Sequence, residues 1–176
     1  MVKLLKFFAF ATFFVLALIY FVPKQSAYYA AEKEARKYKV VLSGEEIVEN
    51  AFSLELNHSS FSYSSIESAT IGSLNVKLFG LYNAISASDI RLSSVAKAFV
   101  PLRIDEMKVT YGVFDPLNAL FSARGEFGAL EGKFNLKDRN VSVILKPSPL
   151  MSSKYQNTMR EFKKNEKGEY EYDKIF

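Results

Sequence analysis

The sequence predicts a mainly β protein with flanking helices, in which a single N-terminal transmembrane helix precedes a mostly antiparallel β-sheet domain. Two patterns carry this prediction. An unbroken apolar run covers residues 7–22 and follows the basic residues Lys3 and Lys6, as in a membrane anchor. From Ala51 onwards, apolar and polar residues alternate with a period of two, which is typical of a half-buried strand. The predicted parts are an anchor at 1–24, a helical stalk and short helix at 25–50, and a periplasmic β-rich domain with a C-terminal amphipathic helix at 51–176.

The apolar run fits either a retained anchor or a cleaved signal peptide. Its core ends in Tyr20, Phe21 and Val22, whereas signal peptidase requires small residues at an Ala-x-Ala spacing. We therefore expect a retained anchor. Lys3 and Lys6 favour a cytoplasmic N-terminus, although the basic residues just after the run count in the opposite direction.

Two helices are expected before the sheet. Residues 26–39 place Tyr28, Ala31, Ala35 and Tyr38 on one helical stripe, with Ser26 as its cap. The sequence Ser43-Gly44-Glu45-Glu46 has the spacing of a capping box, which predicts a short helix ending near Asn50.

About seven strands are expected in the remainder, because alternating runs recur between turn-forming residues. The clearest pair is a hairpin in which 130–136 and 141–145 alternate on either side of Lys137-Asp138-Arg139. A brief helix is predicted from Asp115-Pro116 to Leu120. An amphipathic helix is predicted over Leu150–Lys164, and an edge strand over Glu169–Tyr172.

The residue inventory argues against most catalytic and cofactor-binding sites. Of the 176 residues none is cysteine and one, His58, is histidine, so thiolate or histidine-rich metal sites are excluded and a Ser-His-Asp triad would need that one residue. The formal net charge is only +4, which is no electrostatic footprint for nucleic acid. No phosphate-binding glycine loop is present. We expect no enzyme, no cofactor and no metal, and we interpret His58 as a solvated loop residue.

Two asparagines have the spacing of N-glycan acceptors. Asn57 and Asn140 are each followed two positions later by serine and preceded two positions earlier by an acid, as in the extended acceptor pattern of bacterial periplasmic systems. We expect both on loop or turn edges. Coincidence is the alternative interpretation of each match.

The order of these parts resembles the type II secretion protein N family, whose sheet is related to the AsmA-like envelope proteins. The likeness rests on the basic N-terminus and single anchor, on Gly128-Ala129-Leu130-Glu131-Gly132 before a hairpin, and on the tail 162–170. It implies a non-enzymatic accessory protein of a secretion or envelope-transport assembly, in the bacterial inner membrane with its main domain in the periplasm and with other envelope proteins as partners. One membrane helix plus a small β domain is also similar to the lipopolysaccharide-transport component C, which implies lipid handling in a jellyroll instead. An unfilled apolar channel in the sheet would favour the lipid-handling alternative.

Overall fold

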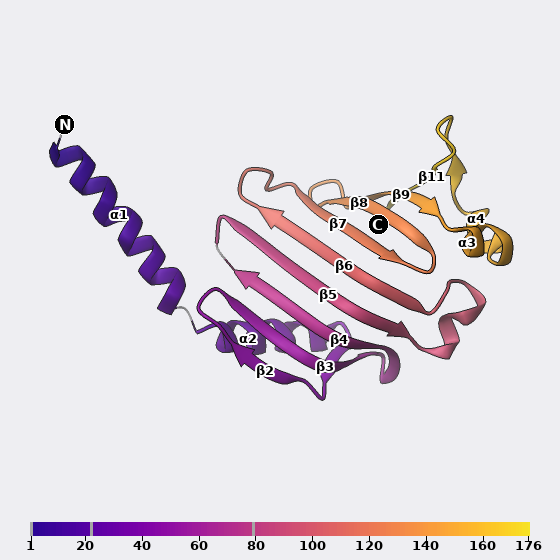
Figure 1. Cartoon of the computed structure of the whole chain (residues 1–176), viewed down its shortest axis with the longest axis horizontal. Helices are drawn as coiled ribbons and strands as arrows, with labels where there is room; N and C mark the ends of the chain where they lie inside the picture. Colours follow the sequence, from indigo (N-terminus) through magenta and orange to yellow (C-terminus); the bar gives the residue numbers. More distant parts are fainter. Residues whose placement is uncertain (1, 22, 79) are drawn as a thin grey trace.

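Residues 51–176 form most of one continuous antiparallel sheet, as seen in a computed structural model that describes residues 2–21, 23–78 and 80–176 (Figure 1). The sheet has eleven strands in the order β1-β3-β4-β5-β6-β7-β8-β9-β11-β10, and β2 also pairs with β3. Met1, Val22 and Phe79 lie outside the described residues, so the parts of the predicted anchor and strand that fall on them are not described. The mainly β, antiparallel class with N-terminal helices is confirmed, and the expectation of about seven strands was too low.

The elements in chain order are α1 (Val2–Phe21), α2 (Lys24–Lys37), β1 (Val40–Ser43), β2 (Glu46–Glu49), β3 (Ser53–Tyr63), β4 (Ile66–Leu78), β5 (Tyr82–Leu92), the 3-10 helix η1 (Ser94–Ala98), β6 (Arg103–Gly112), β7 (Asn118–Gly125), β8 (Gly128–Asn135), β9 (Asn140–Pro147), α3 (Pro149–Lys154), α4 (Gln156–Met159), β10 (Lys163–Lys164) and β11 (Tyr170–Ile175).

Helix α1 projects away from the sheet (Figure 1). It occupies the predicted anchor and exposes large apolar side chains, including Phe7, Phe13 and Phe21. In the described ranges, no helix has the combination of length and apolar character that crossing a membrane requires. The membrane-spanning part of the prediction is therefore not supported by the structure.

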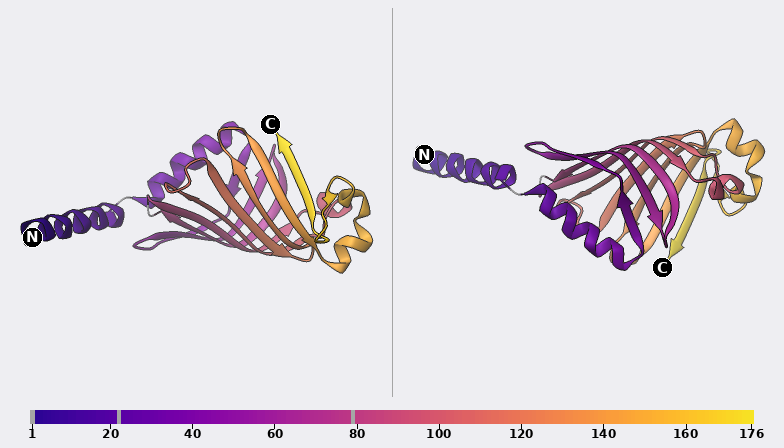
Figure 2. Two further views of the ribbon diagram at one scale, coloured as in Figure 1. Left: turned by 90° about the horizontal axis from the view of Figure 1, so that it is seen from above. Right: turned by 90° about the horizontal axis from the view of Figure 1, so that it is seen from below.

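Helix α2 lies along the sheet instead of extending as a stalk (Figure 2). Its Tyr28 packs against a cluster formed by Leu54, Leu56 and Leu74 of β3 and β4. The helix begins after Pro23, so Ser26 lies inside it and is not its cap. Tyr28 of the predicted stripe faces the sheet, because the apolar side chains of β3 and β4 offer it a surface to bury. Ala31 stays exposed, and Tyr38 lies just past the end of the helix and is 70% exposed.

The predicted short helix from Ser43 to Asn50 is wrong, because this segment forms β1, a turn and β2. Gly44 has φ +78°, a left-handed conformation that glycine adopts at little cost and that interrupts a right-handed helix. Ile47 then pairs with Leu56 of β3 and packs against its cluster. Glu45 accepts a hydrogen bond from the Tyr28 hydroxyl instead of serving in a capping box.

The predicted helix at Asp115-Pro116 is also wrong. The segment is a turn, and β7 begins at Asn118. The Asn118 amide donates to both Asp115 carboxylate oxygens at 2.8 and 3.0 Å, so the aspartate stabilises the turn instead of capping a helix.

The β8–β9 hairpin is confirmed, with Asn135 opposite Asn140. The Asn135 side-chain oxygen accepts from the backbone N–H groups of Lys137 and Asp138 at 3.0 and 2.8 Å, and Arg139 takes φ +50°. Side-chain capping of this kind is the usual reason for asparagine before a tight turn.

The predicted C-terminal helix is divided into α3, α4 and the two-residue strand β10. Ser148 caps α3 by accepting from the Met151 N–H at 3.1 Å. The chain leaves helical geometry at Tyr155, with φ −114° and ψ 39°. Met151, Tyr155 and Met159 nevertheless stay on one side and form a buried cluster with Phe127 and Leu145. The predicted edge strand is present as β11, between β9 and β10.

Candidate functional site

One face of the sheet is apolar along its whole width. Residues directly opposite each other in neighbouring strands share a face, so the register defines rows that cross the sheet. One row runs through Leu54, Val76, Ile85, Val109, Phe121, Gly132, Val143 and Tyr172. The next runs through Leu56, Leu74, Ala87, Met107, Ala123, Leu130, Leu145 and Tyr170. We call this side of the sheet the apolar face.

The opposite side is polar and charged. Its central row runs through Glu55, Asn75, Ser86, Lys108, Ser122, Glu131, Ile144 and Glu171. Alternation between a wet and a dry side is usual for an antiparallel sheet that packs on one face. The apolar face is therefore the side of the sheet that can bury apolar groups.

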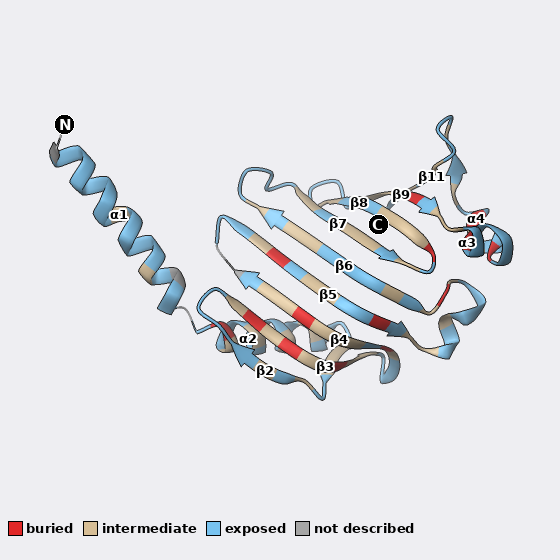
Figure 3. Cartoon of the chain, viewed as in Figure 1, coloured by how far each residue is buried: buried red, intermediate tan, exposed pale blue. Residues whose placement is uncertain are grey.

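Helices cover only the two ends of the apolar face. Helix α2 packs on the cluster of β3 and β4, and α3 with α4 packs on the cluster that includes Leu130 and Leu145. Buried residues lie on β3, β4 and β5 and around α3 and α4, whereas β6, β7 and β8 carry none (Figure 3). Between them, Ile85, Met107 and Tyr111 remain 46%, 40% and 37% exposed. The middle of the apolar face is thus an uncovered apolar surface.

Where α2 lies over the sheet, a groove of about 300 Å³ remains between them. The helix contributes small side chains to it at Ala27, Ala31 and Ala35, one turn apart. Its other lining residues are Lys24, Tyr28, Glu32, Val40, Leu42, Leu54, Leu74, Val76 and Ile85. Because Ile85 belongs to both surfaces, the groove continues into the uncovered middle of the apolar face.

Polar contacts hold the N-terminal half of α2 in place beside this groove. Lys24 is 3% exposed, and its backbone N–H donates to Glu49 Oε1 at 3.1 Å. Its Nζ donates to the Tyr20 carbonyl at 3.4 Å and lies 3.8 Å from the same Glu49 oxygen. The Tyr28 hydroxyl donates to Glu45 Oε1 at 2.9 Å. Burial raises the pKa of Tyr28 above its ordinary value, and the bond to Glu45 raises it further.

A glycine keeps the middle of the apolar face shallow. A Cβ atom at Gly132 would lie 2.3 Å from Cζ of Phe121, so the Phe121 ring occupies the space beside the glycine of the neighbouring strand. Any larger residue at position 132 would push the ring outward into the space above the sheet.

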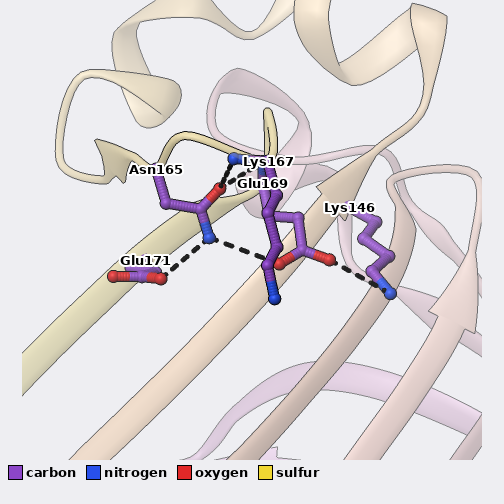
Figure 4. Close-up of polar contacts among 5 residues, drawn as sticks. All are labelled: Lys146, Asn165, Lys167, Glu169 and Glu171. Atoms are coloured by element: carbon purple, nitrogen blue, oxygen red, sulfur yellow. Dashed lines mark hydrogen bonds and ion pairs between the residues drawn. The ribbon is translucent and has the colours of Figure 1, made fainter.

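A second polar network joins the far end of the sheet (Figure 4). Asn165 Oδ1 accepts from the backbone N–H groups of Lys167 and Glu169 at 3.0 and 2.9 Å. Its Nδ2 donates to Glu171 Oε1 at 2.8 Å and to Glu169 Oε2 at 3.3 Å. Lys146 Nζ lies 3.2 Å from Glu169 Oε1. These contacts fix the β10–β11 turn to β9, and the Asn165 and Lys146 partners lower the pKa of Glu169.

The predicted acceptor asparagines do not lie together. Asn57 is half-buried inside β3, opposite Glu46 and Ser73, instead of on a loop edge. Asn140 begins β9 at the hairpin, as expected, and its Nδ2 is 3.5 Å from Ser142 Oγ. Strands β4 to β8 separate the two. Glycosylation of Asn57 and Asn140 stays a prediction.

His58 also lies within β3 instead of in the predicted loop, and it is exposed with φ +57°. Across the described part of the chain, His, Cys, Asp and Glu side chains form no group that could hold a metal ion. The residues that the structure brings together are instead the alanines of α2 and the apolar side chains of the central strands. The alanine spacing was the available sequence signal for this groove.

Comparisons of the chain with protein-family models, curated proteins and solved structures find no match.

Proposed function

We propose that this chain is a non-enzymatic accessory protein of an envelope-transport or secretion assembly, attached to the bacterial inner membrane through α1, with its sheet in the periplasm. The exposed apolar side chains of α1 support attachment to lipid, because a helix that is apolar all round is stable only when something apolar surrounds it. The resemblance to the type II secretion protein N family supports the envelope setting.

Within that role, we propose that the apolar face receives lipid. The observation that carries this proposal is the uncovered middle of the face, where Ile85 and Met107 stay 46% and 40% exposed between two helix-covered ends. An exposed contiguous apolar surface marks an interaction site more often than it marks packing. The continuity of this surface with the α2 groove gives an acyl chain a path along the sheet.

Photo-crosslinking in living cells tests this proposal with a matched pair of positions. Met107 and Lys108 are neighbours in β6 whose side chains lie on opposite faces, since Met107 is opposite Ala87 while Lys108 is opposite Ser86. A photoreactive residue at position 107 is expected to capture lipid, and the same residue at 108 is not. Equal lipid capture at both positions, or none at 107, would refute lipid binding on this face.

A second candidate is a scaffold that binds proteins through a sheet edge. Strand β11 pairs with β9 along one edge, and β10 covers its other edge only opposite Tyr170 and Glu171. Among the described residues, that outer edge has no strand partner from Tyr172 to Ile175. Such an edge can accept a strand from another protein. Capture of a secretion protein at position 173, with no lipid at 107, would favour the scaffold over the lipid carrier.

A further inference from the structure

We propose that the groove between α2 and strands β1, β3, β4 and β5 is a binding site for one acyl chain whose headgroup is uncharged or zwitterionic. This inference rests on the proposed lipid-handling function and names the part of the lipid that is bound and the place that binds it. The site is the part of the apolar face that α2 flanks, and it opens onto the uncovered middle of the face at Ile85.

The lining selects an apolar ligand. Nine of the twelve lining residues are alanine, valine, leucine or isoleucine. The helix contributes three alanines, and the strands contribute Val40, Leu42, Leu54, Leu74, Val76 and Ile85. Water in such a space finds few hydrogen-bond partners, whereas apolar molecules enter apolar cavities readily. A hydrocarbon chain is therefore the favoured occupant.

The helix is held above the sheet at a fixed height, so the groove does not close by collapse. Lys24 is bonded to Glu49 of β2 at 3.1 Å through its backbone, and Tyr28 is bonded to Glu45 at 2.9 Å. Between these contacts and the C-terminus of α2, the side chains at positions 31 and 35 are too short to fill the gap. The volume of about 300 Å³ corresponds to roughly ten groups the size of a water molecule, at about 30 Å³ each, and a methylene group is of similar size.

The charges at the groove argue against an anionic headgroup. Lys24 and Glu32 line the groove. Glu32 is paired with Arg36 at 2.7 Å, and Lys24 lies beside Glu49. Among the groups that line the groove or bond directly to its lining, the three carboxylates of Glu32, Glu45 and Glu49 face the two basic groups of Lys24 and Arg36, so a further negative charge beside them would be repelled.

The position of the groove suits a ligand that arrives from a bilayer. Lys24 lines one end of it and its Nζ donates to the Tyr20 carbonyl of α1 at 3.4 Å. The apolar helix and the apolar groove therefore meet at one residue. A chain leaving lipid around α1 would reach the groove before the middle of the sheet.

The test uses the full chain held in an amphipathic polymer and titrated by calorimetry with hexyl, octyl, decyl and dodecyl maltoside below their micelle concentrations. Affinity is expected to rise about fourfold per added methylene up to roughly the decyl chain, and then to level off as the groove is full. Sodium laurate, with twelve carbons in total and an anionic carboxylate head, is expected to bind more weakly than dodecyl maltoside. No maltoside binding, or stronger binding of laurate, would overturn the proposal.

Two alanine substitutions provide the matched variants. Ala31→Leu fills the groove and is expected to weaken decyl maltoside binding at least tenfold, whereas Ala30→Leu, on an exposed position outside the lining, should change it less than twofold. Both variants carry the same residue change in the same helix, and circular dichroism checks that each folds. Ala27→Leu serves in the same way if Ala31→Leu does not fold. Equal effects of the groove and control variants would overturn the site assignment.

The failure of this inference differs from failure of the proposed function. If the wild-type chain binds no maltoside while position 107 still captures lipid in cells, the α2 site is wrong and lipid handling on the open face stands. If an apolar peptide, and no maltoside, binds the groove, the site is a peptide site and the acyl-chain proposal is refuted.

Discussion

Removing one leucine from each face of the sheet should have very different costs. Leu56 is 0% exposed in β3 and lies between Ile47 of β2 and Leu74 of β4. Leu120 of β7 is 50% exposed and lies opposite Thr110 and Lys133 on the polar face. Leu→Ala in both positions loses the same strand preference, so the difference between them measures burial.

The expected magnitudes follow from that burial. Leu56→Ala removes a fully buried side chain from a site whose neighbours are fixed by strand pairing, so both the transfer and the cavity contributions apply, about 4 kcal/mol in total. Leu120→Ala loses only the half of its side chain that is buried, about 1 kcal/mol, and leaves no cavity.

Urea unfolding followed by circular dichroism measures both values. With a slope of about 2 kcal/mol per molar urea, the midpoint should fall by about 2 M for Leu56→Ala and by about 0.5 M for Leu120→Ala. Equal shifts, or a larger shift for Leu120→Ala, would show that the apolar face is not where the stability of the sheet resides.

Two further predictions concern pH. The Tyr28 pKa lies above its ordinary 10.0 because burial and the bond to Glu45 favour the neutral phenol; the stability this contributes is complete below pH 10 and is lost as pH rises above it. Tyr28→Phe should therefore flatten the decline in melting temperature at alkaline pH, and an unchanged decline would assign it to other groups. The Glu169 pKa lies below its ordinary 4.5 because Asn165 and Lys146 stabilise the carboxylate, so its stabilisation is present above that pH and is lost on acidification. Glu169→Gln should reduce the acid sensitivity of the β10–β11 turn in hydrogen exchange, whereas an effect spread evenly over the sheet would contradict this local role.

The sequence predicts β3 to β6, β8 and β9 because a period of two is a local signal, whereas β2 and the start of β7 were predicted as helix. The β8–β9 hairpin follows from alternation on each side of a turn whose asparagine caps it. The prediction for the segment around Glu45 and Glu46 was wrong because its charges match a helix cap, whereas its structure is determined by pairing with β3. Ile47 lies opposite Leu56 of β3, and this pairing is a tertiary contact that the local sequence pattern does not contain.

The candidate site is less accessible to sequence reasoning. The spacing of Ala27, Ala31 and Ala35 shows that one stripe of α2 is small, but it does not show which surface the stripe meets. The exposure of Met107 depends on how far α2 and the C-terminal helices reach over the sheet, which alternation in β6 does not encode. The sequence therefore predicts an apolar face and leaves its uncovered part to the structure.

The apolar face stays continuous because the alternation between apolar and polar sides is interrupted at the same row in several strands. His58, Gly72, Asp89 and Asp105 occupy successive strands between paired positions of the register, and His58 and Asp89 have φ +57° and +48°.

On either side of that row, residues three apart share the apolar side. Leu74 and Ile71 do so in β4, where both pack on the same cluster, and Met107 and Ile104 do so in β6, opposite Ala123 and Gly125. A strict period of two would have placed one member of each pair on the polar face. Where this row reaches the β6–β7 pairing, the register shifts by one residue between Ile104 and Glu106. Such a bulge bends a strand and increases its twist, which accords with the curled sheet in Figure 2. We therefore explain His58 by its backbone conformation, because it lies in the row at which the alternation is interrupted. This row keeps the surface that is proposed to hold lipid continuous.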